Sequence, residues 1–411
     1  MSRKLLKQIR NEWKSNIWLA VELLVVSVVL WYILDNLYVN YRIYSMPLGF
    51  DVEHCYKLTF DDVTDKSPDF IPDETDEQQR EAKSILLDRL AHHPIVEAAT
   101  LSQNAHPYNG SNSGTFVFKD TLRSNGYVVR RMVTPDFPRV FRFQGTRGET
   151  PEELTEMLKS GKILVNDRLF RHYGVRMTDY VGQEFCVDDS TNVKVLGAAL
   201  VGPRYNDYTD FDHTVLRALP KSWFGWADEF SIRVKPEEDH DVVETLMDQA
   251  ETLFHVGNKV LVNVQSYDDI KRIVLYGNSQ HMTYMLVGMG FLLLNIFLGL
   301  FGTFWFRTQQ RVGEIAIRKA MGATNWEVCR RLLTEGLVIL LLVTPFAFGI
   351  DCLLAYFEVN TYFDDGYLQL WRVALCAFGA AVLMALMIMA GVWFPASRAE
   401  KIDPAIALKD E

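Results

Sequence analysis

The stretch Arg307–Gly336, RTQQRVGEIAIRKAMGATNWEVCRRLLTEG, decides how this 411-residue chain is organised. Its pattern predicts two helices. The first runs from about Thr308 to Met321 and ends at Gly322, the residue type best suited to a left-handed turn. Thr324, followed three residues later by Glu327, has the spacing of a capping box, which starts the second helix. The stretch therefore predicts a short amphipathic helix, a tight turn, and a helix that continues into the apolar sequence beyond.

Apolar runs on both sides of this stretch, and two more elsewhere, are long enough to cross a membrane. A transmembrane helix needs about 20 apolar residues to cross about 30 Å of hydrocarbon. The runs that qualify are Ile17–Leu34, Met282–Phe306, Gly336–Phe357 and Val373–Phe394. The first is too long for a typical signal peptide and lacks a small-residue cleavage site, so we expect it to be retained as an anchor. Pro345 in the third run predicts a kink or hinge, since proline removes one backbone hydrogen bond.

The distribution of lysine and arginine around these runs predicts their orientation, because basic residues are held on the cytoplasmic side. Basic residues precede the first run, fill the link between the second and third, and follow the fourth. The link between the third and fourth runs contains only acidic charges before Arg372. We therefore expect both termini in the cytoplasm and the sequence from about Asn40 to His281 outside.

The composition is that of a folded chain and excludes some classes of protein. It is 49% hydrophobic and 23% charged, with a net charge of -10, which argues against nucleic-acid binding. Five cysteines are too few and too scattered for a disulfide framework or a zinc site. Cys55 and Cys186 could share an oxidising compartment, so a bridge between them stays open.

Two ionisable residues, Glu22 and Asp351, fall inside the first and third apolar runs. Such residues are rare at membrane depth and usually face a protein interior. A proton relay would need further groups. The simpler interpretation is that Glu22 reaches toward the interface or pairs with another helix.

The sequence between the first two runs predicts an α+β domain built from two similar strand–helix–strand units. The first unit is expected at Cys55–Phe60, Glu74–His92 and Ile95–Ser102, and the second at Phe230–Lys235, Glu237–Phe254 and Lys259–Gln265. We expect the two units to associate into one α+β sandwich, with the sequence between them forming an inserted lobe. Within that lobe, the strand candidates are Tyr127–Val133, Lys162–Asn166 and Val193–Val201, and the helix candidate is Pro151–Ser160.

Nothing in this domain has a spacing that predicts catalysis or metal binding. The adjacent His92 and His93 point to different sides and cannot form a helical i, i+4 ligand pair. The acidic run from Asp61 to Glu77 lacks the fixed spacing of a calcium-binding EF-hand loop. GxSxG and HExxH motifs are absent, so we expect no catalytic residue and no metal.

Several stretches resemble the MacB/FtsX superfamily of ABC transporter permeases. RVGEIAIRKAMGATNWEVCRRLLTEGLV resembles the family motif in which an E-I-x-I-R-K/R-A-x-G-A core opens the second cytoplasmic passage. The C-terminal FPASRAEKIDPAIALKDE resembles the family's P-A-x-x-A-x-x-x-P-x-x-A-L ending. KILVNDRLFRHYGV, DYVGQEF and VKVLGAALVGPR look like the family's extracytoplasmic domain, so the resemblance covers the chain nearly end to end.

The resemblance implies a membrane α-helical fold with four transmembrane helices and an α+β extracytoplasmic domain of two lobes. Residues 1–40 would form a cytoplasmic N-terminal helix and the first span, and residues 282–411 an FtsX-type permease domain with three spans and a cytoplasmic coupling helix. Residues 41–281 would form a MacB-type domain, with a porter-like lobe at about 48–107 and 229–265 and an inserted lobe at about 108–228. The expected location is the bacterial inner membrane, with the large domain in the periplasm.

By the same resemblance, the cytoplasmic stretch docks on an ABC ATPase subunit dimer and couples it to the spans. The residues implied are Arg311, Glu314, Ile315, Arg318, Lys319, Gly322, Ala323 and Thr324. The chain has no GxxxxGK[ST] loop, so we expect no cofactor in this chain, with ATP and Mg bound by the separate ATPase. Four spans are few for a transport pathway, which predicts a second permease copy or a related permease as a partner.

The implied function is that of a permease subunit rather than an enzyme, serving efflux or export of a drug, peptide or other envelope substrate. A periplasmic adaptor and an outer-membrane channel are further candidate partners beside the lipid bilayer. One alternative is a non-transporting signal transducer that regulates an envelope enzyme, as FtsX-like proteins do. Another is a receptor with an outer ligand-binding domain, and the sequence does not identify the cargo.

Overall fold

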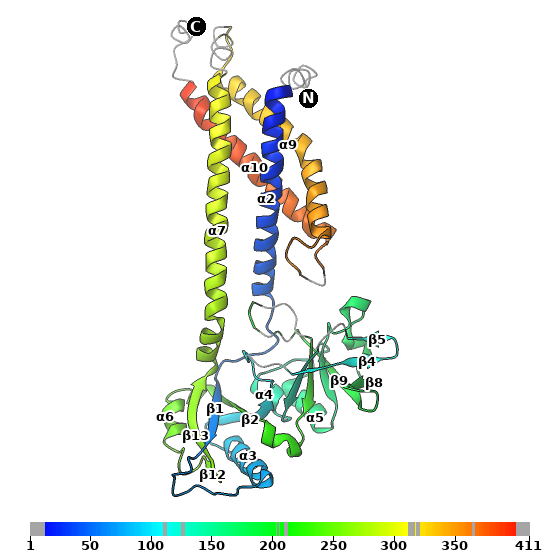
Figure 1. Cartoon of the computed structure of the whole chain (residues 1–411), viewed down its shortest axis with the longest axis vertical. Helices are drawn as coiled ribbons and strands as arrows, with labels where there is room; N and C mark the ends of the chain where they lie inside the picture. The colour runs from blue at the N-terminus through cyan, green and yellow to red at the C-terminus, as the bar shows by residue number, and fades with distance from the viewer. Residues whose placement is uncertain are drawn as a thin grey trace. The chain divides into compact units, whose positions relative to one another are not determined.

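The computed structural model describes residues 13–109, 113–124, 128–202, 204, 206–208, 213–310, 317, 321–363 and 366–399. The chain divides into two compact units (Figure 1). One comprises Met1–Arg42 with Gln280–Glu411 and is called the membrane unit below. The other, Ile43–Ser279, is called the soluble domain.

Four long apolar helices carry the predicted spans. They are α2 (Trp13–Ser45), α7 (Tyr267–Gln310), α9 (Asn325–Tyr356) and α10 (Leu370–Ala399). Each contains a stretch long and apolar enough to cross a membrane, and no other helix among the described residues does. The predicted fold class, four membrane helices with an α+β domain between the first and second, is confirmed.

The core of the membrane unit is formed mainly by α2, α9 and α10. Their fully buried side chains include Trp31, Ile339 and Ile388, whereas α7 adds only Leu300 to this buried cluster. Just 11% of the most apolar window of α7 is buried inside the chain, against 33% to 39% for the other three. Most of α7 therefore faces lipid or another protein.

The two predicted strand–helix–strand units interlock in the soluble domain. The first is β1 (Cys55–Asp62), α3 (Asp76–Ala91) and β2 (Val96–Gln103), and the second is β11 (Glu229–Val234), α6 (Val242–Met247) and β13 (Lys259–Ser266). The strands lie in the order β13-β1-β11-β2 with antiparallel neighbours. The two strands of each unit thus lie on either side of one strand of the other unit, which is the split βαβ arrangement. The predicted association of the two units is confirmed.

The helix predicted over Glu237–Phe254 is wrong in extent, since α6 covers only Val242–Met247. A 3-10 turn, η4 (Pro236–Glu238), comes first, and Asp241 then adopts a φ of 51°, outside the helical region. Hydrogen-bonded turns follow α6, and Ala250 and Phe254 remain buried in them. The apolar spacing therefore predicted correctly which side chains are buried, but it did not predict where the helix ends.

The same sheet continues through the sequence between the two units. Its further strands are β3 (Gly114–Thr115), β4 (Val117–Lys119), β5 (Leu122–Arg123), β6 (Val128–Val133), β7 (Ile163–Asn166), β8 (Glu184–Val187), β9 (Val193–Leu200), β10 (Thr214–Ala218) and β12 (His255–Val256). The helices are α4 (Phe137–Val140), α5 (Pro151–Lys159), η1 (Arg171–Tyr173), η2 (Met177–Tyr180) and η3 (Lys221–Trp226). Because β2 pairs with β6, the described residues form one 13-stranded sheet. The division into a porter-like and an inserted lobe stays a prediction.

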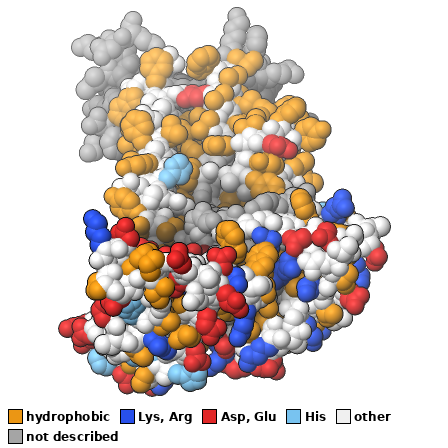
Figure 2. All heavy atoms as spheres, turned by 60° about the horizontal axis from the view of Figure 1, so that its bottom comes forward, with side chains coloured by type: hydrophobic (Ala, Val, Ile, Leu, Met, Phe, Trp, Pro, Cys, Tyr) orange, Lys and Arg blue, Asp and Glu red, His pale blue; other side chains and the backbone are white. Residues whose placement is uncertain are grey.

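Apolar side chains fill both faces of this sheet. On one face, Leu86 of α3 and Leu246 of α6 pack with Ile232 of β11. Another cluster joins Phe137 of α4 and Leu158 of α5 to the start of α7. Figure 2 shows mostly hydrophobic side chains over the membrane unit and a mixture of charged, hydrophobic and other side chains over the soluble domain, as expected for surfaces facing lipid and water.

Candidate functional site

The turn predicted at the centre of Arg307–Gly336, called the coupling segment from here on, is present. Gly322 has a φ of 93°, the left-handed conformation that glycine adopts at no steric cost. Just before it, the backbone N–H of Met321 donates to the carbonyl of Ile317 at 3.1 Å, the spacing of a helical turn. The chain therefore turns at the predicted glycine, whereas most of the helix predicted before it lies outside the described residues.

The capping box that begins α9 is also confirmed. The Glu327 N–H donates to Thr324 Oγ1 at 3.3 Å, and the Thr324 N–H donates to Glu327 Oε2 at 3.0 Å. These hydrogen bonds lower the pKa of Glu327 below its ordinary value. The turn from Gly322 to Thr324 is thus fixed at both ends by backbone geometry.

The structure describes only part of the implied docking surface. Gly322, Ala323 and Thr324 lie together in the turn. Beside them Ile317 and Met321 are 51% and 76% exposed, which leaves two apolar side chains for a partner to cover. The remaining implied residues, Arg311, Glu314, Ile315, Arg318 and Lys319, lie outside the described residues.

Two further residues of the spans have defined surroundings. Pro345 lies inside α9, which continues on both sides of it, and its role as a hinge stays a prediction. Glu22 of α2 accepts a hydrogen bond from Thr303 Oγ1 of α7 at 3.0 Å. The interpretation that Glu22 pairs with another helix is therefore confirmed. Glu22 is near the start of the first candidate span and Thr303 is the last residue of the second, so the pair joins α2 and α7 at the end of the spans next to the coupling segment.

Where α2 ends, a buried arginine binds one carbonyl of its last turn and two carbonyls of the residues that follow. Arg204 is 2% exposed, and its guanidinium donates to the carbonyls of Ile43 and Met46, the latter at 3.0 Å. Its backbone N–H donates to the carbonyl of Leu48 at 2.9 Å. The last carbonyls of a helix have no intrahelical donor, and a cation there is favourable. Arg204 therefore holds the last turn of α2 and the residues after it, which belong to the soluble domain themselves.

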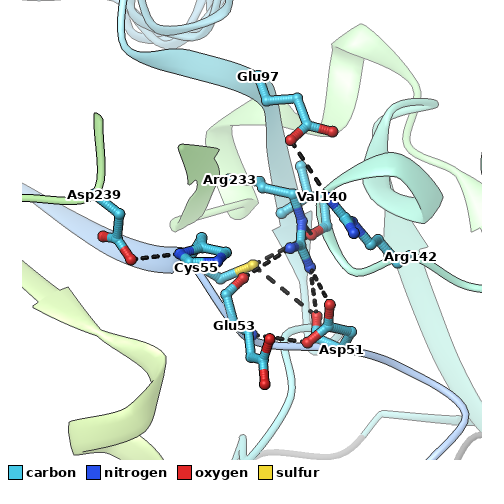
Figure 3. Close-up of polar contacts among 9 residues, drawn as sticks. Asp51, Glu53, Cys55, Glu97, Val140, Arg142, Arg233 and Asp239 are labelled. Atoms are coloured by element: carbon cyan, nitrogen blue, oxygen red, sulfur yellow. Dashed lines mark hydrogen bonds and ion pairs between the residues drawn. The ribbon is translucent and has the colours of Figure 1, made fainter. Parts of the chain in front are cut away.

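A second buried arginine holds the residues between α2 and β1 (Figure 3). Arg233 of β11 donates through Nη1 to the Glu53 carbonyl at 2.7 Å and through Nη2 to the Asp51 carbonyl at 2.9 Å. Its Nε donates to the Val140 carbonyl at 2.7 Å. The Arg233 side chain thus connects β11 both to the residues that precede β1 and to α4.

The beginning of α7 is bound to the same parts of the soluble domain. Tyr267 is fully buried, and its hydroxyl lies 2.7 Å from Ser231 Oγ of β11. One turn along, Lys271 Nζ pairs with Asp207 Oδ1 at 3.2 Å, and Asp207 also accepts from the Tyr108 hydroxyl. Burial raises the pKa of Tyr108 well above its usual value, so it remains a donor.

These contacts, made by Arg204, Asp207, Ser231 and Arg233, are called the stem junction. Ser231 and Arg233 are two residues apart on β11 and so face the same side of the sheet, where one holds the start of α7 and the other the chain following α2. Sequence reasoning did not find this junction. The available signal was a serine and an arginine alternating with Phe230, Ile232 and Val234, which is typical of a strand with one face in water.

Cys55 lies next to the stem junction but is not a reactive group. Its thiol donates to the Val140 carbonyl at 3.2 Å, and burial raises its pKa to about 12. Both Cys55 and Cys186 are free thiols, so the disulfide that the sequence left open does not form. His54 beside it pairs with Asp239 through Nδ1 at 2.5 Å.

The histidine pair and the acidic run singled out in the sequence have different surroundings. His93 is buried and lies 3.1 Å from Gln249 Oε1, whereas His92 is exposed at the end of α3. In the acidic run, Thr75 and Gln78 form the capping box of α3. Among the described residues, no three His, Cys, Asp or Glu side chains come together as metal ligands.

Comparison with known proteins adds one match. Residues 286–404 match the family model of the FtsX-like permease C-terminal domain. This range contains the coupling segment, α9, α10 and the part of α7 from Leu286 onward. No curated protein matches the chain.

Proposed function

The chain carries an FtsX-like permease C-terminal domain and has four candidate spans, as a MacB/FtsX-type permease does, and from this premise we propose that it is the membrane subunit of an ABC transporter. A separate ATPase subunit dimer docks on the coupling segment, and ATP hydrolysis by this dimer moves the segment. The spans convey the movement to the soluble domain, which then changes shape. The cargo is a drug, peptide or other substrate of the cell envelope that is exported or extruded.

The observation that carries this proposal is the continuity of α7. It is one helix of 44 residues from Tyr267 to Gln310, and about 1.5 Å per residue makes it about 66 Å long. A span needs only about 30 Å of that length. The same helix therefore reaches from the coupling segment, through the membrane, to a fully buried anchor in the soluble domain.

The second stem supports the same path. The carbonyl end of α2 is bound by Arg204, and the chain that follows is bound by Arg233. Because Ser231 and Arg233 share β11, a relative shift of α2 and α7 acts on one strand of the sheet. In this proposal, a movement at the coupling segment acts on β11 of the soluble domain.

A second permease copy, or a related permease, completes the membrane part. The small buried fraction of α7 supports this, since a helix that lines a pathway needs protein on more than one side. A side chain added at Gly288, Gly299 or Gly302 of α7 would meet nothing within 4 Å, so another helix backbone can approach closely there.

The orientation is part of the proposal. Basic residues flank the spans on the side of the coupling segment, so that side faces the cytoplasm and the ATPase. The soluble domain then lies outside, in the periplasm of a bacterium, where an adaptor and an outer-membrane channel can reach it. The chain itself has no phosphate-binding GxxxxGK[ST] loop, and the ATPase partner supplies ATP and Mg.

The test is ATP hydrolysis coupled to transport in a complex of this chain with its ATPase, reconstituted in lipid. Gly322→Pro is expected to abolish coupled transport, because proline fixes φ near −65° where the turn needs 93°. Gly322→Asn is the matched control, since asparagine tolerates the left-handed region. Glu314→Arg should also abolish coupling, through loss of the docking contact, without blocking membrane insertion.

The outcomes separate the alternatives. Cargo-stimulated hydrolysis with efflux supports transport, whereas activation of an envelope enzyme without export would replace it by signal transduction. Wild-type coupling in both Gly322→Pro and Glu314→Arg would remove the role of the coupling segment. A chain that binds a ligand outside the cell and no ATPase would be a receptor.

A further inference from the structure

A carboxylic acid without a partner is buried among the spans. Asp351 lies in the third candidate span, Leu333–Tyr356, and is 1% exposed. Neither of its carboxyl oxygens makes a hydrogen bond with any described residue. An isolated carboxylate is very costly to bury in an apolar environment, so the group is expected to be neutral or to gain a partner.

Among the described residues, one cation and one further acid lie in the same buried region. On α10, Arg372 is fully buried, and its Nε lies 3.0 Å from Asp35 Oδ1 of α2. The contact is an ion pair rather than a well-directed hydrogen bond. Cys376, one turn further along α10, lies within electrostatic range of Asp35, Arg372 and Asp351. Cys352 is the neighbour of Asp351 on α9 itself.

The guanidinium of Arg372 is only partly used. Its Nη2 donates to the carbonyls of Thr361 and Tyr367, each at 2.9 Å, and its Nε faces Asp35. Its Nη1 makes no hydrogen bond within the described part of the chain. Arg372 therefore has a donor left for a second carboxylate but already balances the charge of Asp35.

The charges of this group do not balance unless a proton is added. Two carboxylates, Asp35 and Asp351, share the buried region with one guanidinium, and a net charge among the spans is strongly disfavoured. We propose that Asp351 is a proton-binding site, which holds a proton while Arg372 is paired with Asp35 and releases it when Arg372 becomes available.

The step is a proton transfer and needs no other reactant. The O–H bond of the Asp351 carboxyl breaks, water takes the proton, and the carboxylate that remains is neutralised by Arg372. Since α9 packs against α10, a shift between these helices is what brings the two side chains together. Rearrangement of the third and fourth spans is thereby linked to uptake or release of one proton, whichever cargo the protein carries.

The test uses the full chain in lipid and dicyclohexylcarbodiimide, which modifies protonated carboxyl groups in apolar surroundings. Mass spectrometry of the peptides should find Asp351 modified at neutral pH, with Asp35 and the water-facing Asp239 unmodified. In Asp35→Asn the guanidinium is released, so Asp351 should ionise and its labelling should be lost. Neither readout depends on an ATPase, so failure of this proposal and failure of the proposed function can be told apart.

Infrared difference spectra provide a second measurement. The carbonyl band of a protonated carboxyl group should be present in the wild type and absent in Asp351→Asn, which keeps the size and neutrality of the protonated acid. Absence of labelling at neutral pH, as expected if water or a partner helix solvates an ionised Asp351, would overturn the proposal. Full labelling of Asp351 in Asp35→Asn would do the same, because the charge balance with Arg372 would then be wrong.

Discussion

Buried charges are treated in opposite ways in the two units of this protein. In the soluble domain, Arg233 gives hydrogen bonds to the carbonyls of Asp51, Glu53 and Val140, so its donors are nearly all used. In the membrane unit, Arg372 has an unused donor and Asp351 has no partner among the described residues. Fully satisfied polar groups fix one conformation, whereas unsatisfied ones leave a second arrangement accessible. The contacts of Arg233 are therefore expected to stay intact during the rearrangement of the spans that we propose.

The largest expected effect tests the rigid side of this comparison. Arg233→Met should lower the free energy of unfolding of the soluble domain by about 3–5 kcal/mol, because a buried charge network loses its centre and the freed carbonyls find no water. Hydrogen exchange of the β1 and β11 amides in the full chain measures the change. Arg142→Met is the matched control.

The control residue, Arg142, is drawn beside Arg233 in Figure 3 and also pairs with a carboxylate, but it is far more exposed to water. Arg142 pairs with Glu97 at 3.6 Å and is 47% exposed, so its loss should cost less than about 1 kcal/mol. Equal protection in the wild type and Arg233→Met would show that the segment before β1 does not depend on this side chain. The comparison between the two units would then fail on its rigid side.

A smaller effect is expected where α7 enters the soluble domain. Tyr267→Phe removes the hydroxyl that lies 2.7 Å from Ser231 Oγ and should cost about 1–2 kcal/mol, since the serine remains buried without this partner. Urea denaturation of the detergent-solubilised chain measures the loss. Ser231→Ala and the double variant complete a cycle, and a coupling energy near zero would mean that the hydrogen bond does not anchor α7.

How far the sequence predicts this architecture differs between the two units for a physical reason. Lipid imposes long apolar helices, so the four spans are readable from composition alone. The soluble domain was readable only where one face of a strand is apolar. Ser231 and Arg233 were missed because α4 and neighbouring backbone cover a face whose polar pattern is typical of exposure to water.

The missed part of α7 had a local signal. Ser266 Oγ accepts from the Asp269 N–H at 3.2 Å, which is the capping pattern of a helix start well before the apolar run. The turn at Gly322 and the capping box of Thr324 and Glu327, by contrast, were predicted from local backbone chemistry alone, and the coupling role of this segment rests on the family resemblance. Local motifs are thus predictable, whereas the stem junction depends on residues distant in sequence.

A further loss of about 1 kcal/mol is expected at the start of α9. Thr324→Ala removes the side chain that accepts from the Glu327 N–H, and loss of such a cap destabilises the first helical turn. Hydrogen exchange of the first amides of α9 should become faster. Thr334→Ala is the control on the same helix, because its hydroxyl only donates back to the Arg330 carbonyl. Equal exchange in the two variants would contradict the capping role.

The smallest effect concerns Asp239 of the soluble domain, which is hydrogen-bonded to Tyr56 and His54. Burial by itself would raise the pKa of Asp239, but hydrogen bonds from Tyr56 and His54 outweigh it and lower the pKa below its ordinary value. A carboxyl group whose pKa is lower in the folded state stabilises the fold fully above its unfolded pKa of about 4, and this contribution is lost as the pH falls through the lowered folded value. Asp239→Asn should therefore be less stable than the wild type at neutral pH, and the difference should shrink in acid. Tyr56→Phe should show part of the same dependence in acid unfolding curves. A difference in stability that stayed constant with pH would show that Asp239 contributes by packing and not through the charge of its carboxyl group.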